Sequence, residues 1–309
     1  MKKVGCIMNY LKKPWRIPIT IQNHGLGRFV PDKLYIRCMF KEQLGYWPNL
    51  RKPVTFSEKL QWLKLYDHNP LYTTMVDKYA VKNYVAQIIG EEYIIPTLGV
   101  WDSFDEIDFD MLPNQFVLKC THDSGGLVIC KDKFQFDKKK ARDKIQKSLS
   151  TDYYLLGREW PYKNVPRRII AEKYMEDSGT KELRDYKFFC FGGQVKCYKI
   201  DFDRIFEHHA NYFDKEGNLI YAGEEICPPV FDKKLNSSLN IKEMQKLAEK
   251  LAENLPFLRA DFYDVDGKIY FGELTFFPAS GFGKFKPEQF DYELGKWMTI
   301  SDSGGNLNN

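Results

Sequence analysis

The sequence lacks the cysteine and histidine patterns that mark disulfide-stabilised or zinc-binding proteins. Its seven cysteines are odd in number and form no C-x-x-C pair, and its five histidines include no H-E-x-x-H spacing. These absences exclude a closed disulfide set, a zinc ribbon and a zinc hydrolase of the H-E-x-x-H type. We expect the cysteines to be reduced and mostly buried thiols.

Long apolar runs and a strong net charge are also missing. No stretch approaches the roughly 20 apolar residues of a membrane-spanning helix. The N-terminus has no apolar core followed by a small-residue cleavage site, so we expect a cytoplasmic protein. A net charge of +4 is too weak to argue for nucleic-acid binding, although it is compatible with anionic ligands. The Walker motif G-x-x-x-x-G-K-[ST] does not occur.

A chain of 309 residues is long enough to divide into two lobes with a cleft between them. Strand patterns mixed with a few helices, without strict β-α-β alternation, indicate α+β lobes. The expected strands span residues 116–120, 127–131, 168–175, 185–191, 194–200, 209–213 and 219–222. The expected helices span 58–66 with Ser57 as the cap, then 73–90, 138–149, 242–254 and 288–297, and the stretch before Pro53 is expected to be irregular.

Residues 116–130, F-V-L-K-C-T-H-D-S-G-G-L-V-I-C, combine a lysine with a glycine turn. An expected strand leads into Lys119, and Gly125 and Gly126 allow a flexible turn before the next strand. Such a hairpin can lay backbone N–H groups over phosphate oxygens, and Lys119 would add a positive charge. An ordinary hairpin with an exposed lysine is the alternative interpretation.

Residues 167–177, R-R-I-I-A-E-K-Y-M-E-D, run as an apolar strand into Glu172. Backbone groups of this segment could lie along an adenine edge, with the carboxylate near a ribose or the exocyclic amine. Further on, Asp185 and Lys187 stand two apart on one expected strand, so their side chains share a face. A salt-bridged, exposed strand would give the same pattern.

Residues 258–281 are the most informative segment, because two expected strands flank Asp266-Gly267 and each carries one carboxylate, Asp261 or Glu273. Two buried carboxylates beside Arg259 suggest a cation between them, since an unpaired buried carboxylate is costly. Mg²⁺ suits such a pair, because it takes one or two carboxylates and completes its shell with waters and phosphates. A structural salt-bridge cluster is the alternative.

The turn at Asp266-Gly267 decides whether these carboxylates meet. A two-residue turn opposes Asp261 to Gly272 and sends the two carboxylates to opposite faces. A three-residue loop over 265–267 with a left-handed Gly267, or a compensating bulge, brings them to one face. We expect one of these two arrangements, because only they make a metal site.

The order of these pieces resembles the ATP-grasp superfamily. More narrowly, it resembles the TupA-like ATP-grasp family, which is associated with teichuronopeptide and with capsular or other cell-surface polysaccharide biosynthesis. The resemblance covers about residues 55–281. It rests on K-L-Q-W-L-K-L-Y-D, V-D-K-Y-A-V-K, F-V-L-K-C-T-H-D-S-G-G, I-I-A-E-K-Y-M, D-Y-K-F-F-C-F-G-G and G-E-L-T-F-F-P-A-S-G, which are specific only together.

The resemblance implies an α+β ATP-grasp fold in which two lobes grip ATP. Residues 111–175 would form the small lobe with a Gly-rich lid, and residues 176–300 the large lobe with the Mg²⁺ site. A reduced region with irregular and helical parts would span residues 1–110, and a disordered tail would span residues 301–309.

The resemblance also implies roles for individual residues. The implied nucleotide-binding residues are Lys119, His122, Ser124, Gly125, Gly126, Glu172, Lys173, Tyr174, Met175, Asp185 and Lys187. The implied metal ligands are Asp261, Glu273 and Thr275. Arg259 and Lys187 would act in catalysis, Arg259 by stabilising the transferring phosphoryl group or the tetrahedral intermediate. One departure is that Thr275 stands where many ATP-grasp ligases have asparagine, so a hydroxyl replaces an amide oxygen at a second metal ion.

The implied activity is that of an ATP-dependent carboxylate–amine ligase that works through an acyl phosphate, with ATP and Mg²⁺ as cofactors. Its partners would be a carboxylate-bearing sugar or amino acid and an amine acceptor, and no nucleic acid. A glycosyltransferase is a second interpretation, because Asp201-Phe202-Asp203 and Asp108-Phe109-Asp110 fit D-x-D. A kinase that stops after phosphoryl transfer and a non-catalytic nucleotide-binding module are further alternatives.

The N-terminal segment is basic and aromatic. It could dock on the inner face of an anionic membrane or form a solvated basic edge. The residues concerned are Lys2, Lys3, Tyr10, Leu11, Lys12, Lys13, Trp15 and Arg16.

Overall fold

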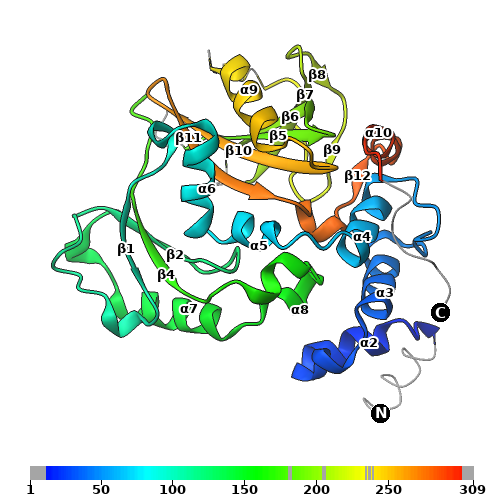
Figure 1. Cartoon of the computed structure of the whole chain (residues 1–309), viewed down its shortest axis with the longest axis horizontal. Helices are drawn as coiled ribbons and strands as arrows, with labels where there is room; N and C mark the ends of the chain where they lie inside the picture. Colours follow the sequence, from blue (N-terminus) through cyan, green and yellow to red (C-terminus); the bar gives the residue numbers. More distant parts are fainter. Residues whose placement is uncertain are drawn as a thin grey trace.

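Two antiparallel sheets dominate the computed structural model, which describes residues 12–179, 183–203, 207–233, 235, 238 and 240–300. The small sheet has the strand order β1-β4-β2-β3, and the large sheet has the order β11-β10-β5-β6-β7-β8. Helices α5 and α6 lie between the two sheets (Figure 1). The expected α+β architecture is confirmed.

The small sheet packs its apolar face on α7 (Lys138–Ser150). Its strands are β1 (Thr97–Trp101), β2 (Phe116–Cys120), β3 (Leu127–Cys130) and β4 (Ile169–Lys173). In β2, Phe116, Leu118 and Cys120 are buried in the core shared with α7. Because side chains alternate along a strand, Lys119 projects from the opposite face.

The large sheet is covered on one face by α9 (Ile241–Leu251), which buries Met244, Leu247, Ala248 and Leu251. Its strands are β5 (Asp185–Phe191), β6 (Gln194–Phe202), β7 (His209–Asp214), β8 (Leu219–Ile220), β10 (Phe257–Val265) and β11 (Lys268–Thr275). A separate pair joins β9 (Gly223–Glu224) to β12 (Phe285–Lys286).

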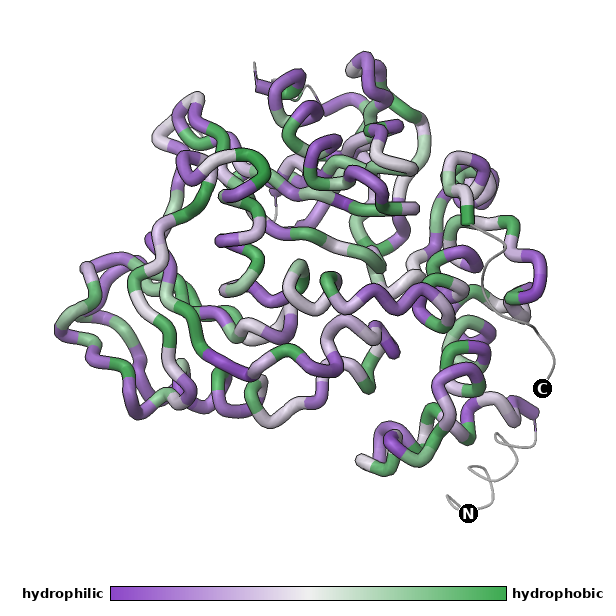
Figure 2. The backbone as a smooth tube through the Cα atoms, viewed as in Figure 1, coloured by the Kyte–Doolittle hydropathy of each residue, from purple (hydrophilic) through white to green (hydrophobic). Residues whose placement is uncertain are grey.

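The remaining helices surround this body. They are α2 (Arg16–Ile21), α3 (Asp32–Leu44), α4 (Phe56–Tyr66), α5 (Leu71–Val76), α6 (Ala80–Ile89), α8 (Tyr153–Gly157) and α10 (Gln289–Trp297). Short helical turns span Gln22–Leu26, Gly27–Phe29, Glu91–Tyr93, Phe104–Glu106, Lys133–Gln135, Trp160–Asn164 and Pro278–Gly281. Helices α2 and α3 extend away from the two sheets (Figure 1). Helix α3 carries both hydrophobic and hydrophilic residues along its length (Figure 2).

Three local predictions were wrong. The stretch before Pro53 contains α2 and α3 and is therefore not irregular throughout. The cap of α4 is Thr55, whose hydroxyl accepts from the Glu58 N–H in a capping box, and not Ser57. The single helix expected over 73–90 is two helices, because the Asp77 carboxylate caps the N–H groups of Tyr79 and Ala80 and starts α6 anew.

The expected strands of the site are confirmed, whereas β1, β9 and β12 were not foreseen. Six cysteines of the described residues are buried free thiols, as expected; Cys6 lies outside those residues. The tail after residue 300 and the segment around Tyr10 also lie outside them. Among the described helices, none has the length and apolar character needed to cross a bilayer.

Candidate active site

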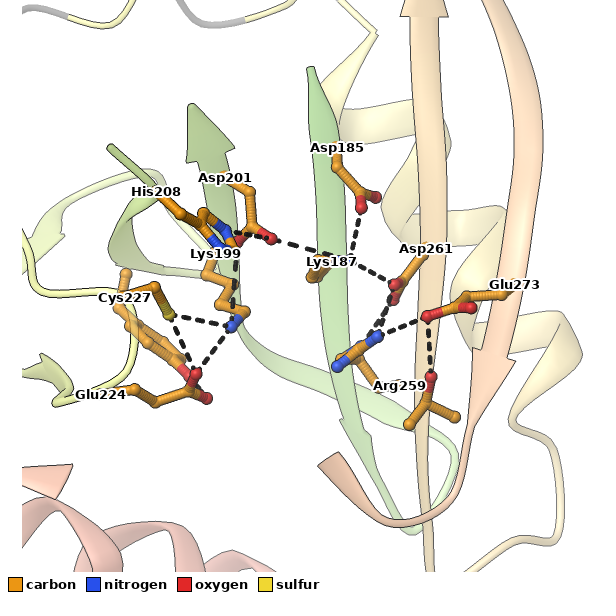
Figure 3. Close-up of polar contacts among 12 residues, drawn as sticks. Asp185, Lys187, Lys199, Asp201, His208, Glu224, Cys227, Arg259, Asp261 and Glu273 are labelled. Carbon is orange, nitrogen blue, oxygen red and sulfur yellow. Dashed lines mark hydrogen bonds and ion pairs between the residues drawn. The ribbon is translucent and has the colours of Figure 1, made fainter. Parts of the chain in front are cut away.

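A row of charged side chains crosses the large sheet on the face that α9 does not cover (Figure 3). Glu273 on β11 lies opposite Asp261 on β10, and Asp261 lies opposite Lys187 on β5. Lys187 in turn lies opposite Lys199 on β6. Arg259, two residues before Asp261, points to the same face. Strand pairing therefore gathers residues that are far apart in the sequence.

A bulge at Gly272 sets the register of β10 and β11. Val265 pairs with Lys268, so the turn has only two residues, Asp266 and Gly267, both with positive φ (53° and 79°). The ladder then shifts between Asp261 and Phe262 and leaves Gly272 as the extra residue. Of the two expected arrangements, the structure has the compensating bulge and not the three-residue loop, and this bulge places Asp261 opposite Glu273 and confirms the shared face.

Arg259 occupies the position between the two carboxylates. Its Nε and Nη2 atoms donate to Asp261 Oδ1 and Oδ2, each at 2.7 Å, and Nη2 also donates to Glu273 Oε1 at 2.9 Å. Lys187 Nζ donates to Asp261 Oδ2 at 2.7 Å and to Asp185 Oδ2 at 2.5 Å. Asp185 and Lys187 share a face, as predicted.

The two opposing carboxylates differ in their electrostatic surroundings. Burial raises the pKa of Asp261 to about 6, although Arg259 and Lys187 act to lower it. Burial also acts to raise the pKa of Glu273, but Arg259 and Lys187 outweigh it and lower that pKa to about 2. The Asp261 side chain is 1% exposed and that of Glu273 is 44% exposed. Glu273 is therefore the more accessible member of the pair and the one with the lower pKa.

These residues fit a cation that arrives together with phosphate. Within the described part of the chain, no group of three or more His, Cys, Asp or Glu side chains forms a ready-made metal cage. Two carboxylates, one of them accessible, match the way Mg²⁺ is held jointly by protein and nucleotide. The Thr275 hydroxyl lies 3.4 Å from Glu273 Oε1, so it belongs to the same cluster. Asp261, Glu273 and Thr275 are thus the candidate Mg²⁺ ligands.

The small sheet and α6 contribute a second charged cluster. Glu172 Oε2 contacts Lys119 Nζ at 2.6 Å, and Glu172 Oε1 contacts Lys82 Nζ at 2.5 Å. Burial acts to raise the pKa of Glu172, but the two lysines lower it below its ordinary value. A small cavity of about 40 Å³ connects this cluster with Glu273. Its lining includes Lys78, Lys82, Lys119, Glu172, Gly272 and Glu273.

Lys78 and Lys82 had no predicted role. The signal in the sequence was V-D-K-Y-A-V-K, which contains both residues. Their position in the cavity depends on how α6 approaches both sheets, which residue spacing alone does not reveal.

The predicted Gly-rich lid is a turn tied closely to its surroundings. The Gly126 N–H donates to both Asp123 carboxylate oxygens at 3.1 Å, and Ser124 Oγ lies 2.9 Å from the Tyr153 hydroxyl. A Cβ at Gly126 would meet Ser148 Oγ at 2.4 Å, so this glycine is needed for packing against α7. His122 is buried, with Nε2 3.3 Å from the Thr151 carbonyl at the end of α7.

The predicted adenine-binding segment follows the end of β4. The Lys173 N–H donates to the Pro96 carbonyl at 3.1 Å, so this donor is already engaged. The Tyr174 hydroxyl donates to Glu176 at 2.6 Å, and Lys131 lies over the Tyr174 ring. Tyr174 and Met175 remain as the segment that could border an adenine.

Neither D-x-D pair lines this cavity. Asp201 is buried on β6 beside Lys187, whereas Asp203 lies just past the strand and pairs with Lys233. Asp108 accepts from the Asp110 N–H at 2.9 Å in a local turn.

Comparisons with known proteins identify one family and several similar structures. A family model described as TupA-like ATPgrasp matches residues 58–299. No curated protein matches the chain. Among solved structures, D-alanine–D-alanine ligase from Helicobacter pylori is 14% identical, with a TM-score of 0.38 over 79% of this chain and 69% of that one. A RimK-domain ATP-grasp protein from Sphaerobacter thermophilus is 9% identical, with a TM-score of 0.40 over 75% of this chain and 70% of that one.

An ADP complex of the N5-carboxyaminoimidazole ribonucleotide synthetase purK is 16% identical, with a TM-score of 0.37 over 71% of this chain and 50% of that one. This chain thus spans between half and about seven tenths of these three proteins, and similarity at this level concerns the fold alone. The family match covers most of the chain. The chain therefore belongs to the TupA-like ATP-grasp family.

Proposed function

We propose that the protein joins a carboxylate to an amine through an acyl phosphate, at the expense of ATP. The observation that carries this proposal is the cavity bounded by Lys119 and Glu172 on one side and by Glu273, with Arg259 and Asp261 beside it, on the other. Cations from one sheet and paired carboxylates from the other suit a polyphosphate and its metal ion.

The residues divide the work by position. Lys119 would bind phosphate oxygens, and Lys187 and Arg259 would stabilise the charge that develops on the transferring phosphoryl group and then on the tetrahedral intermediate. Asp261 and Glu273, with Thr275 beside them, would hold Mg²⁺, which neutralises phosphate charge when bound. In the first step a substrate carboxylate attacks the γ-phosphate and ADP leaves. In the second step an amine displaces phosphate from the acyl phosphate.

For the substrate, we infer a uronic-acid or amino-acid carboxylate on a precursor of a cell-surface glycan, joined to an amino acid or another amine. The resemblance to a family associated with such polysaccharides supports this class. We also infer that the protein works at the inner face of a membrane, where lipid-linked glycans are assembled. Residues 1–52 support this with eleven Lys and Arg against two acidic side chains.

Two of the residues predicted to meet the membrane are engaged within the protein. Trp15 and Arg16 both turn inward to contact Glu42 of α3. The accessible apolar side chains nearby include Ile17, 48% exposed, and Phe29, 75% exposed. Apolar groups beside cationic ones are the combination that an anionic bilayer surface attracts.

A matrix of uronic acids against amino acids, scored by ATP-dependent phosphate release, tests the proposed function. Glu273→Gln serves as the inactive control, because it keeps the volume but removes the charge facing the metal and the phosphoryl group. We expect it to lower turnover at least about a hundredfold. Acid labelled with ¹⁸O in its carboxylate should deliver one ¹⁸O atom to the released phosphate.

The labelling result separates the alternatives. A kinase would give a stable phosphoester and no free phosphate, and a glycosyltransferase would consume a sugar nucleotide without ATP. Phosphate that is released without ¹⁸O, or a Glu273→Gln variant with near-normal turnover, would contradict the acyl-phosphate route.

A further inference from the structure

A histidine–carboxylate pair adjoins the charged row on the large sheet. His208 precedes β7, and its Nε2 lies 3.1 Å from Oδ2 of Asp201 on β6 (Figure 3). The Asp201 side chain is 2% exposed, whereas that of His208 is 39% exposed. A buried carboxylate thus lies against one nitrogen of an imidazole that remains accessible.

The pair is connected to the residues assigned to catalysis. Asp201 Oδ2 lies 3.8 Å from Lys187 Nζ, and Lys187 contacts Asp261 at 2.7 Å. Lys199 Nζ lies 3.8 Å from Asp201 Oδ1 and is itself held by Glu224 at 2.9 Å. Lys187 and Lys199 are thus charged neighbours of the pair. Asp201 therefore lies between His208 and Lys187, and His208 stands at the end of the row that is farther from Glu273.

Resting on the function proposed above, we propose that His208 is the general base that takes the proton from the attacking amine, and that Asp201 positions its ring. A carboxylate beside Nε2 favours the tautomer with the proton on Nε2 and leaves the lone pair on Nδ1. The Nε2–H is not aligned for a hydrogen bond to Asp201, and catalytic contacts often align only when substrate binds.

The carboxylates of the row are less suited to this task. Asp261 and Glu273 are held by Arg259, and Asp185 by Lys187. Asp185 and Asp261 are buried, and Glu273 is assigned to Mg²⁺, so none of them is placed to take a proton from the amine. An imidazole has the proton affinity that the step requires, because amines bound for acyl transfer must lose a proton near pH 7.

Amide formation makes one bond and breaks one bond. The amine lone pair attacks the carbonyl carbon of the acyl phosphate, and a C–N bond forms. The C–O bond to phosphate breaks, and phosphate leaves with the electron pair. The nitrogen releases one proton to Nδ1 of His208, which later passes it to solvent. ATP supplies the activation in the earlier step, so no other reactant is needed.

Competition between two nucleophiles tests this role. Hydroxylamine is largely unprotonated at neutral pH, so it should capture the acyl phosphate as a hydroxamate without a base, whereas an amino acid should need one. The assay uses the most active uronic acid of the phosphate-release matrix, with either hydroxylamine or the amino acid. In His208→Ala we expect amide formation to fall at least about a hundredfold. Hydroxamate formation should stay near the wild-type rate.

Two controls guard against a structural explanation. His209→Ala changes the neighbouring histidine, whose Nδ1 lies 2.9 Å from the Pro228 carbonyl, and it should leave both products unchanged. Added imidazole should restore part of the amide formation in His208→Ala. Equal loss of amide and hydroxamate, or loss of neither, would overturn the role of His208. If the wild type makes neither product with any acid, the proposed function itself is wrong and this inference falls with it.

Discussion

Replacing Gly272 with valine tests what places Asp261 and Glu273 on one face. A Cβ at position 272 would lie 3.0 Å from the Asp261 carbonyl oxygen and 3.2 Å from the Tyr263 ring. The first neighbour is backbone of the residue that must stay opposite Glu273, so it cannot retreat without opening the ladder. The two further methyl groups of valine increase the crowding.

Two effects should follow, with different magnitudes. Overpacking at a sheet position costs about 1–3 kcal/mol of unfolding free energy, so the protein should still fold. Turnover should fall at least about a hundredfold, because a strand that sheds its bulge turns Glu273 to the other face and removes one strong electrostatic contact. Activity should therefore be lost well below the denaturation temperature.

Gly267→Ala in the same hairpin is the matched control. Gly267 has a φ of +79°, but no atom lies within 4 Å of the added Cβ. The substitution should cost about 1 kcal/mol through backbone strain and leave the bulge intact. Thermal unfolding and ATP-dependent phosphate release measure both variants. Normal turnover in Gly272→Val, or an equal loss of turnover in Gly267→Ala, would show that the bulge does not set the site.

Four further outcomes are expected. Lys119→Ala should weaken ATP binding in calorimetry with little change in melting temperature, and unchanged affinity would place the phosphate site elsewhere. Burial raises the pKa of Asp291 from 3.8 to about 6, so the folded protein holds this proton more tightly than the unfolded chain and loses stability as the pH rises from about 4 to about 6. Asp291→Asn keeps an acceptor for Ser57, so at pH 7.5 it should raise the free energy of unfolding by up to about 3 kcal/mol and with it the melting temperature. At pH 4 the variant and the wild type should melt at the same temperature. Chelating Mg²⁺ should weaken ATP binding in the same calorimeter. At low salt, the protein should sediment with anionic vesicles, and Phe29→Ser should reduce the sedimented fraction. Equal recovery in the supernatant with anionic and with neutral vesicles would contradict membrane binding.

The strands of the site were predictable because alternation along a strand is a local property. The two-residue spacing of Asp185 and Lys187 fixed their common face, and their contact confirms it. The choice between a three-residue loop and a bulge was not local in this sense. Both satisfy the same alternation, and the bulge depends on the backbone contact that only a glycine at position 272 allows.

The helical segments were harder to predict because their boundaries depend on distant side chains. Asp77 ends α5 and begins α6, and its carboxylate also accepts from Arg168 next to β4 at 2.8 Å. In α3, the buried residues Tyr35, Ile36, Cys38 and Phe40 do not form one clean stripe. Buried side chains that are spread around a helix in this way give no simple amphipathic period, so the sequence of the N-terminal region predicted no helix.

The pairing of charges explains why nucleotide and metal should bind together at this site. In the large sheet, Arg259 is shared by Asp261 and Glu273, and Lys187 is shared by Asp261 and Asp185, so a cation that turns to phosphate is withdrawn from two carboxylates at once. Such a loss costs several kcal/mol. A divalent cation removes that cost, because it takes over the negative charge of Asp261 and Glu273 while the two side chains face phosphate.

The small sheet solves the same problem without a metal ion. Glu172 contacts two lysines, Lys119 at 2.6 Å and Lys82 at 2.5 Å. If Lys119 turns to a phosphate oxygen, Lys82 still neutralises the buried carboxylate, so the exchange leaves no charge unpaired. One half of the cavity can therefore release a cation on its own, and the other half can do so only when Mg²⁺ is present. The proposed dependence of ATP binding on Mg²⁺ would thus originate in the large sheet, where each of the two cations serves two carboxylates.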